Sequence, residues 1–263
     1  MVLKIRDIVK NKPDGLFFTR LFVSERKQIA IIADRLFAAR RSEMRIFMKY
    51  TTILFDLDGT LLDTLKDLTV SINYALKQLG FPERTIDEVR RFVGNGMAKL
   101  VERALSAAGA PASLAKSCLT LFSGYYKEHI HDYTVAYPGV TQLLQTLKKA
   151  GCKLAIVSNK MDDPVKSLAN LYFPDLIDAA IGTPSDHKKP DPYCVYTALH
   201  KLHSTPEQSI YIGDSHVDVE TAKNAGIPCI CVSWGFAGRK GLAECHPDII
   251  VDTADELASL LEL

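Results

Sequence analysis

Short apolar runs alternate with helical patterns along the chain from residue 52 onward. The runs hold three to five residues each and cover 52–55, 153–157, 179–181, 209–212, 228–232 and 249–251. Between them, apolar residues recur at helical spacing, as Val140, Leu143, Leu144 and Leu147 do before Gly151. Strands that are apolar on both faces and joined by helices form parallel sheets covered on both sides. The pattern therefore predicts an α/β fold with a doubly wound, Rossmann-like parallel sheet.

The alternation is interrupted once, by a long helical stretch after the first apolar run. Residues 65–132 show only helical periodicity, with apolar faces that end at Gly80 and Gly109. We expect residues 65–132 to form an inserted α-helical cap domain, and residues 48–64 and 133–263 to form the α/β core. Because ligands of such sheets bind at the carboxyl ends of the strands, the cap is expected to cover that edge. A thick layer of helices packed on the sheet is the alternative, which periodicity leaves open.

The composition is that of a folded protein with a substantial core. Of 263 residues, 47% are hydrophobic and 24% are charged, which excludes a disordered chain. No run of about 18 uncharged apolar residues occurs, so no membrane span is expected. The net charge of +1 argues against binding to nucleic acid. None of the six cysteines forms a CxxC pair, so we expect reduced thiols and a cytoplasmic protein.

The near-neutral total conceals a basic segment at the start of the chain. Residues 1–47 carry 11 Lys and Arg against 5 Asp and Glu, whereas residues 48–263 carry 21 against 26. Our first interpretation is an upstream extension of the reading frame, with translation starting at Met48. The second is an interaction helix that docks through its arginines, namely Arg35, Arg40, Arg41 and Arg45. An organelle-targeting peptide ranks third, because five acidic residues are too many for that pattern.

Two carboxylates follow the first apolar run and carry the most specific chemical signal. The segment 53–63 reads ILFDLDGTLLD and places Asp56 and Asp58 at the carboxyl end of the expected strand. A carboxylate such as Asp56 attacks phosphorus to form an aspartyl-phosphate. Asp58 is placed to protonate the leaving oxygen and then to activate water. Gly59 permits the sharp backbone exit that brings both groups close to a substrate. An acidic turn is the alternative for this segment taken alone.

The ends of three later strands carry groups that suit the same chemistry. Ser158 ends the second strand and offers a hydroxyl to a phosphoryl oxygen. Lys189 follows the third strand, just before a rigid proline, and offers an ammonium to transferring phosphate charge. Asp214 follows the fourth strand and, with Asp56 and the backbone around Asp58, provides oxygen ligands for Mg²⁺. Each feature alone has a plain structural interpretation, but together the four strand ends favour a phosphoryl-transfer site.

These motifs resemble those of the haloacid dehalogenase superfamily. The resemblance covers residues 50–263 and rests on DLDGTLLD at 56–63, the serine after the second strand, KPDP at 189–192 and GDSHVDVETAKNAG at 213–226. It implies a Mg²⁺-dependent hydrolase in which Asp56 is the nucleophile and Asp58 the general acid and base. The implied metal ligands are Asp56, Asp58 and Asp214. The implied phosphate-binding residues are Gly59, Thr60, Ser158, Asn159 and Lys189. The implied supporting residues are Ser215 and Asp218.

The helical insert lies between the first and second motifs, which matches the cap of the phosphoglycolate phosphatase-like branch of that superfamily. Residues 92–96, FVGNG, look like the cap segment of this branch, and Asn95 is expected to approach a small anion there. A plain turn between helices is the alternative.

Within the superfamily, the residues favour one reaction over others. A dehalogenase needs the nucleophile but not a second carboxylate, so the presence of Asp58 favours hydrolysis of a phosphate ester. A phosphonatase is disfavoured because Lys99 is the one obvious amine candidate in the cap.

The sequence therefore predicts a Mg²⁺-dependent phosphatase, a phosphoric monoester hydrolase of carbohydrate metabolism. Its expected substrate is a small phosphorylated metabolite, with 2-phosphoglycolate as the first choice and pyrophosphate, a nucleotide or a sugar phosphate as alternatives. An alternative of another class is a non-catalytic protein that binds or docks a phosphorylated ligand, against which the intact pair Asp56 and Asp58 argues. We expect no nucleic-acid partner, and either a monomer or a homodimer.

Overall fold

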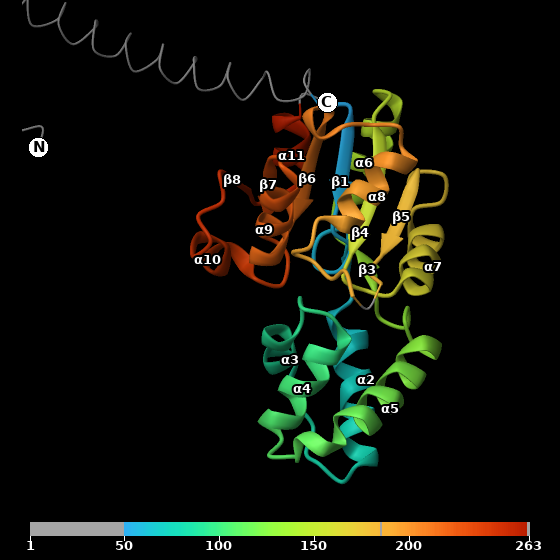
Figure 1. The fold of residues 1–263 in the computed structure, drawn as a ribbon, viewed down its shortest axis with the longest axis vertical. Helices are drawn as coiled ribbons and strands as arrows, with labels where there is room; N and C mark the ends of the chain where they lie inside the picture. Colours follow the sequence, from blue (N-terminus) through green and yellow to red (C-terminus); the bar gives the residue numbers. More distant parts are fainter. Residues whose placement is uncertain (1–49, 185, 262–263) are drawn as a thin grey trace, which may run out of the picture. The chain divides into compact units, whose positions relative to one another are not determined.

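A six-stranded parallel sheet forms the centre of the computed structural model, which describes residues 50–184 and 186–261 (Figure 1). Its strands are β1 (Thr52–Phe55), β4 (Lys153–Ser158), β5 (Ala179–Gly182), β6 (Ser209–Gly213), β7 (Cys229–Val232) and β8 (Ile249–Val251). The spatial order is β5-β4-β1-β6-β7-β8, with every neighbouring pair parallel. The predicted α/β sheet is confirmed, and the strands differ from the predicted runs by at most one residue at an end. The interaction helix and arginines considered for residues 1–47 lie outside the described residues.

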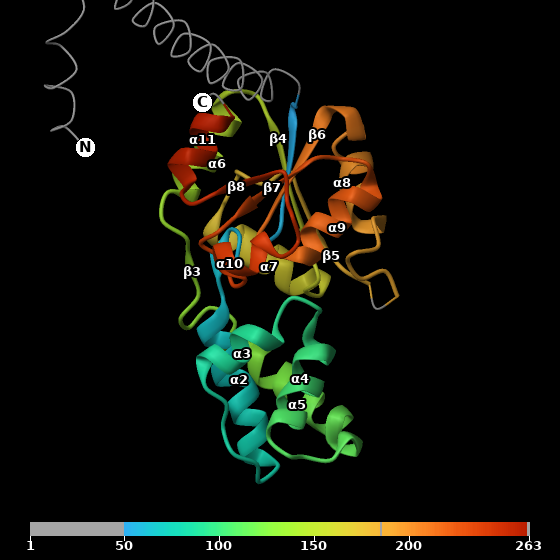
Figure 2. The same ribbon diagram turned by 90° about the vertical axis from the view of Figure 1, so that its left-hand side faces the viewer.

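Helices cover both faces of the sheet, as a doubly wound fold requires. Helices α8 (Tyr193–Lys201) and α9 (His216–Ala225) lie on one face, and α6 (Val140–Lys149) and α11 (Ala254–Leu260) lie on the opposite face (Figure 2). The remaining core elements are α7 (Asp162–Tyr172), α10 (Gly238–Ala243) and a short 3-10 helix, Pro206–Gln208. Every residue of β1 and β6 is buried, which is why these strands read as continuous apolar runs. Within the described residues, no helix is both long and apolar enough to cross a membrane.

Four helices form a separate layer beyond the carboxyl ends of the strands (Figure 1). They are α2 (Leu65–Gln78), α3 (Ile86–Phe92), α4 (Met97–Ala107) and α5 (Ala115–Glu128), with a 3-10 turn at Ala112–Leu114. Their apolar faces bury residues such as Ile72, Leu105 and Phe122, each at most 1% exposed. All four helices fall within residues 65–132, the range predicted for the cap. We call this layer the cap below.

The two chain segments that join the cap to the core are held together at its base. Strands β2 (Leu62–Asp63) and β3 (Val135–Ala136) pair in antiparallel fashion. One turn into α2, the buried carboxylate of Asp67 accepts hydrogen bonds from the backbone N–H groups of Tyr133 and Thr134 and from the Thr134 hydroxyl. Because these bonds satisfy a buried charge, they fix the point at which the chain leaves the core and returns to it.

Gly213 lies against a packed side chain whereas Gly124 faces open space, and this difference in packing can be tested. A Cβ added at Gly213, the last residue of β6, would lie 2.3 Å from Cβ of Asp218, whereas one added at Gly124 in α5 would meet nothing within 4 Å. We expect Gly213→Ala to destabilise the protein by about 2 kcal/mol or more through overpacking. Gly124→Ala is expected to stabilise it by about 0.5–1 kcal/mol, because glycine inside a helix loses more chain entropy than alanine. Urea unfolding of both variants checks this, and equal effects would contradict the packing described here.

Candidate active site

The adjacent strands β1, β4 and β6 bring the predicted functional side chains together at one edge of the sheet. Asp56 and Asp58 follow β1, Ser158 ends β4, and Asp214 follows β6. An inner pocket of about 60 Å³ opens between this edge and the cap. The core side of the pocket is lined by Asp56, Asp58, Ser158, Asn159, Lys160 and Lys189, and the cap side includes Val93, Gly94, Gly96 and Met97.

A buried ammonium group lies at the centre of this edge. Nζ of Lys189 is 2.9 Å from Oδ1 of Asp56 and 2.7 Å from Oδ1 of Asp218. It also donates to the hydroxyl of Tyr211 at 3.2 Å and to the carbonyl of Val157 at 3.3 Å. Burial alone would lower the pKa of this ammonium, but the carboxylates of Asp218 and Asp56 outweigh burial and raise it well above its ordinary value. Lys189 is therefore a permanent cation beside the predicted nucleophile.

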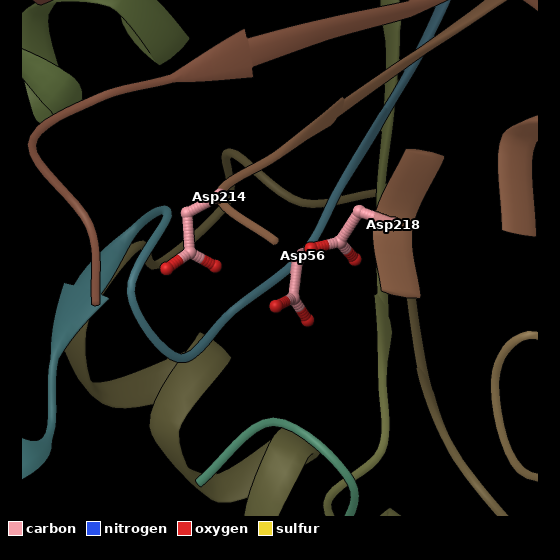
Figure 3. A group of neighbouring side chains, drawn as sticks. All are labelled: Asp56, Asp214 and Asp218. Carbon is pink, nitrogen blue, oxygen red and sulfur yellow. The ribbon is translucent and has the colours of Figure 1, made fainter. Parts of the chain in front are cut away.

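Three carboxylates form a cluster at this edge of the sheet, and two of them, Asp56 and Asp218, contact Lys189. Asp56, Asp214 and Asp218 each offer an oxygen within 4.8 Å of the others (Figure 3). Burial raises the pKa of Asp56 to about 7, and Asp218 and Asp58 add to the rise while Lys189 opposes it. Burial also raises the pKa of Asp214 well above its ordinary value, with Asp218 and Asp56 contributing. One lysine does not offset three buried carboxylates, so this edge of the sheet has an excess of negative charge.

The donors of this cluster fit a hard divalent cation. Carboxylate oxygens are the protein ligands that Mg²⁺ prefers, and it commonly binds through one or two of them and completes its shell with water. Asp56 and Asp214 each keep one oxygen without a hydrogen bond or ion pair among the described residues, because Lys189 contacts only Oδ1 of Asp56 and the backbone of Phe236 donates only to Oδ2 of Asp214. In Asp218, Oδ1 accepts from Lys189, and Oδ2 accepts from both the backbone N–H and the hydroxyl of Ser215. Both oxygens of Asp218 are thus engaged, one by Lys189 and one by Ser215.

Backbone contacts hold Asp214 close to the turn that carries Asp58. The backbone N–H of Phe236 donates to Oδ2 of Asp214 at 2.6 Å. Gly59 has a φ of +92°, and a Cβ added there would lie 2.4 Å from the same oxygen. Only glycine permits both the left-handed conformation and this close approach. The glycine in the first motif thus lets the loop after β1 approach the Asp214 carboxylate closely.

The predicted phosphate-binding residues fall into two groups. Ser158, Asn159 and Lys189 line the inner pocket, and the side chain of Asn159 ties the loop of Lys189 to the cap. Its Oδ1 accepts from the backbone N–H of Lys189 at 2.8 Å, and its Nδ2 donates to the carbonyl of Gly94 at 3.2 Å. The hydroxyl of Thr60 is buried and has no hydrogen-bond partner among the described residues, and Thr60 lines none of the pockets described here.

Asn95 is not among the residues that line the inner pocket. It lines an outer cavity of about 410 Å³, which also contains Asp56, Asp58 and Asp214 on the core side. Its Oδ1 accepts a hydrogen bond from the Arg103 guanidinium at 2.8 Å. Arg90, Arg91 and Arg103 provide positive charge on the cap side of the outer cavity.

Lys160 is a site residue that the sequence analysis missed. Its side chain is buried, and Nζ lies 2.9 Å from Oδ1 of Asp58 and 2.8 Å from the hydroxyl of Tyr126 in α5. Burial alone would lower the pKa of this ammonium, but Asp58 and Tyr126 hold it above its ordinary value. A lysine directly after a strand-end Ser-Asn pair is usually a solvated surface residue. The one available signal was its position, two residues beyond Ser158.

Replacing one carboxylate of the cluster tests whether the buried carboxylates repel one another in the folded protein. The folded state holds the protons of Asp56 and Asp214 more tightly than the unfolded chain does, so metal-free protein loses stability as the pH rises above about 4. For Asp56 this loss continues through about pH 7. We expect Asp214→Asn in EDTA at pH 8 to unfold at a higher temperature than wild type, by about 2–4 °C for each kcal/mol of relieved repulsion. This advantage should shrink at pH 5.

Differential scanning calorimetry with Mg²⁺ supplies the second half of this test. Mg²⁺ should raise the Tm of wild type, more at pH 8 than at pH 6, and raise that of Asp214→Asn much less. Asp255→Asn, an exposed change in α11, is the matched control and should respond to Mg²⁺ as wild type does. An Asp214→Asn variant with the full Mg²⁺ response would contradict this assignment of the cluster.

Known proteins share both the sequence pattern and the fold. The model of the haloacid dehalogenase-like hydrolases matches residues 53–232. A phosphoglycolate phosphatase of Pseudomonas syringae pv. tomato is 36% identical over 209 residues, which are 76% of this chain and 75% of the relative. A phosphoglycolate phosphatase of Aquifex aeolicus is 34% identical over 215 residues, 80% of this chain and 96% of the relative.

A solved structure extends the similarity to the arrangement of the elements. The crystal structure of a predicted phosphoglycolate phosphatase from Haemophilus somnus superposes with a TM-score of 0.74 at 31% identity, covering 80% of this chain and 97% of that protein. The matched residues 53–232 contain the carboxylates, the serine and the lysine that converge at the sheet edge. On its sequence, its α/β fold and its similarity to these proteins, the chain belongs to the haloacid dehalogenase-like hydrolase family.

Proposed function

We propose that this hydrolase is a Mg²⁺-dependent phosphatase that cleaves a small phosphomonoester through an aspartyl-phosphate intermediate. The observation that carries the proposal is the inner pocket, in which the Asp56 carboxylate, the Lys189 ammonium and the Ser158 hydroxyl meet. A carboxylate nucleophile next to a fixed cation suits attack on phosphorus, because the cation offsets the charge of the phosphoryl oxygens. The names of the relatives described above support this reaction class.

The first step transfers the phosphoryl group to the enzyme. An oxygen of Asp56 forms a bond to phosphorus while the bond between phosphorus and the ester oxygen breaks. Asp58, which lines the same pocket, gives its proton to the departing oxygen, so the product leaves as a neutral alcohol. Lys189 and Ser158 hold the phosphoryl oxygens during this exchange.

The second step returns Asp56 to its starting form. Asp58, now a carboxylate, takes a proton from a water molecule as the water oxygen bonds to phosphorus and the bond to Asp56 breaks. Asp56 and Asp214 would hold Mg²⁺ at this site. The bound ion supplies a positive charge that orients the phosphoryl group and stabilises the charge that develops on it. Asp218 keeps the Lys189 ammonium oriented throughout, since the other oxygen of Asp218 is held by Ser215.

We further propose 2-phosphoglycolate as the substrate, on the charge of the outer cavity and the names of the relatives. This substrate carries a carboxylate about two bonds from the ester oxygen, so its second anion would face the cap when the phosphoryl group sits in the inner pocket. The guanidinium groups of Arg90 and Arg91 line the outer cavity on that side, and arginine pairs well with carboxylates. The guanidinium of Arg103 already donates to the carbonyl of Phe92 and to Asn95.

Cytoplasmic residence is also part of the proposal. The described cysteines are all free, and four of them are buried: Cys118, Cys152, Cys194 and Cys231. Reduced thiols of this kind are typical of a reducing compartment.

The proposal is tested by comparing specificity constants with Mg²⁺ present. We expect kcat/KM to be highest for 2-phosphoglycolate, by about tenfold or more over pyrophosphate, a nucleoside monophosphate and a sugar phosphate. Asp56→Asn should lower phosphate release by roughly a thousandfold or more, because it removes the nucleophile. Asp255→Asn, which is remote from the pocket, serves as the control. Equal rates for wild type and Asp56→Asn would rule out the mechanism.

The arginines are tested in the same assay. The double variant Arg90→Ala/Arg91→Ala should raise KM for 2-phosphoglycolate about tenfold and leave ethyl phosphate, which lacks the carboxylate, nearly unchanged. Lys166→Ala removes an exposed cation of α7 that pairs with Asp162 and controls for the loss of positive charge. A similar KM rise for both esters would mean that the arginines do not bind the second anion.

A further inference from the structure

Lys160 joins three separate parts of the molecule. It belongs to the loop after β4, its Nζ contacts Asp58 in the loop after β1, and the same atom contacts Tyr126 in cap helix α5. The lysine side chain is 3% exposed and that of Asp58 is 21% exposed. A buried lysine is costly unless its charge is paired, so this contact is a built feature of the site. The two proposed reaction steps assign no role to Lys160.

The two oxygens of Asp58 are in different situations. Oδ1 accepts hydrogen bonds from the Thr64 hydroxyl at 2.7 Å and from Lys160 at 2.9 Å. Oδ2 has no hydrogen-bond partner among the described residues, and Asp58 lines the inner pocket. Protonation is unfavourable at an oxygen that already accepts hydrogen bonds from an ammonium group and a hydroxyl. The oxygen free to carry the proton is therefore Oδ2.

The anchored oxygen accepts the same two hydrogen bonds whether or not Oδ2 is protonated. Asp58 must alternate between acid and base during one turnover, and a freely rotating carboxyl group would have to find its position again at each step. With Oδ1 held, the carboxyl group keeps one orientation in both forms, which removes a rotational cost from the transition state.

The cap helps to orient Lys160. The Tyr126 hydroxyl lies 2.8 Å from Nζ, and the ammonium lies 4.8 Å from the centre of the Tyr126 ring. Tyr126 is itself 2% exposed and stacks on Phe122, with ring centres 5.6 Å apart. The lysine thus has one partner on the core and one on the cap, and its direction depends on both.

We propose that Lys160 is a positioning residue that anchors Oδ1 of Asp58 and so directs Oδ2 toward the leaving-group oxygen, with Tyr126 holding Lys160 in place from the cap. This inference rests on the proposed function of Asp58 as acid and base. In the first step the proton moves from Oδ2 to the ester oxygen as the bond between phosphorus and that oxygen breaks. In the second step Oδ2 takes a proton from water as the bond between phosphorus and Asp56 breaks. Lys160 keeps its protons in both steps.

The test compares leaving groups, because only a poor leaving group needs the proton. The constant kcat/KM covers the reaction up to release of the alcohol. For Lys160→Met, which keeps the apolar stem and removes the charge, we expect kcat/KM to fall about 100-fold for an alkyl phosphate such as 2-phosphoglycolate. For p-nitrophenyl phosphate, whose phenol leaves without a proton, the change should be less than about threefold. Tyr126→Phe should act in the same direction, by about threefold to tenfold.

Three further variants make the result decisive. Asp58→Asn shows how strongly the rate depends on the leaving group when the acid itself is lost. Lys166→Met is the control for loss of an exposed lysine. Lys160→Arg keeps the positive charge and should recover part of the activity toward the alkyl ester. An equal loss on both esters for Lys160→Met, with leaving-group dependence intact in Asp58→Asn, would overturn the positioning role alone. Absence of that dependence in Asp58→Asn would overturn the acid role and this inference with it. If Lys160→Met does not fold, the ratio of the two constants for Tyr126→Phe decides between the same outcomes.

Discussion

The buried ammonium of Lys189 is the interaction on which the arrangement of this site depends. Its contacts at 2.9 Å with Asp56 and 2.7 Å with Asp218 join the end of β1 to the start of α9. Without that cation, the carboxylates at this edge would repel one another in a poorly solvated space. Even with it, burial raises the pKa of Asp56 to about 7. The site is thus built with an excess of negative charge that one divalent cation would offset.

The sheet order makes this convergence possible. Strand β1 lies between β4 and β6, so residues that are about 100 and 160 positions apart meet at one edge. Gly59 and Gly213 mark two of the close approaches, since a Cβ at either position would collide with Asp214 or Asp218. The core therefore holds in place the proposed nucleophile, the lysine and the carboxylates proposed to bind Mg²⁺. The cap contributes different groups: Tyr126 toward Lys160, and arginines toward the outer cavity.

The strands of the core and the motifs at their ends were predictable because each is encoded by a short, contiguous stretch of sequence. Each buried strand is a short apolar run, and parallel strands place their carboxyl ends at one edge; this was enough to bring Asp56, Ser158 and Asp214 together. Lys160 was not predictable, because nothing in the neighbouring sequence reveals that the lysine turns inward to meet a tyrosine 34 residues earlier in the chain. The role of Asp218 was only partly visible. Its hydrogen bonds with Ser215 are local, but its pairing with Lys189 depends on tertiary structure.

The most direct test of the account is to locate the phosphoryl group during turnover. Enzyme, Mg²⁺ and p-nitrophenyl phosphate labelled in the phosphoryl group are mixed, quenched in cold acid within one turnover, and digested with pepsin at low pH, where an acyl phosphate survives, before peptide mapping. The Asp58→Asn variant should accumulate more label than wild type, because p-nitrophenol leaves without the acid whereas the second step still needs the base. We expect the label on the carboxylate of Asp56. Label on Ser158 or another residue, or no covalent label in either protein, would contradict it.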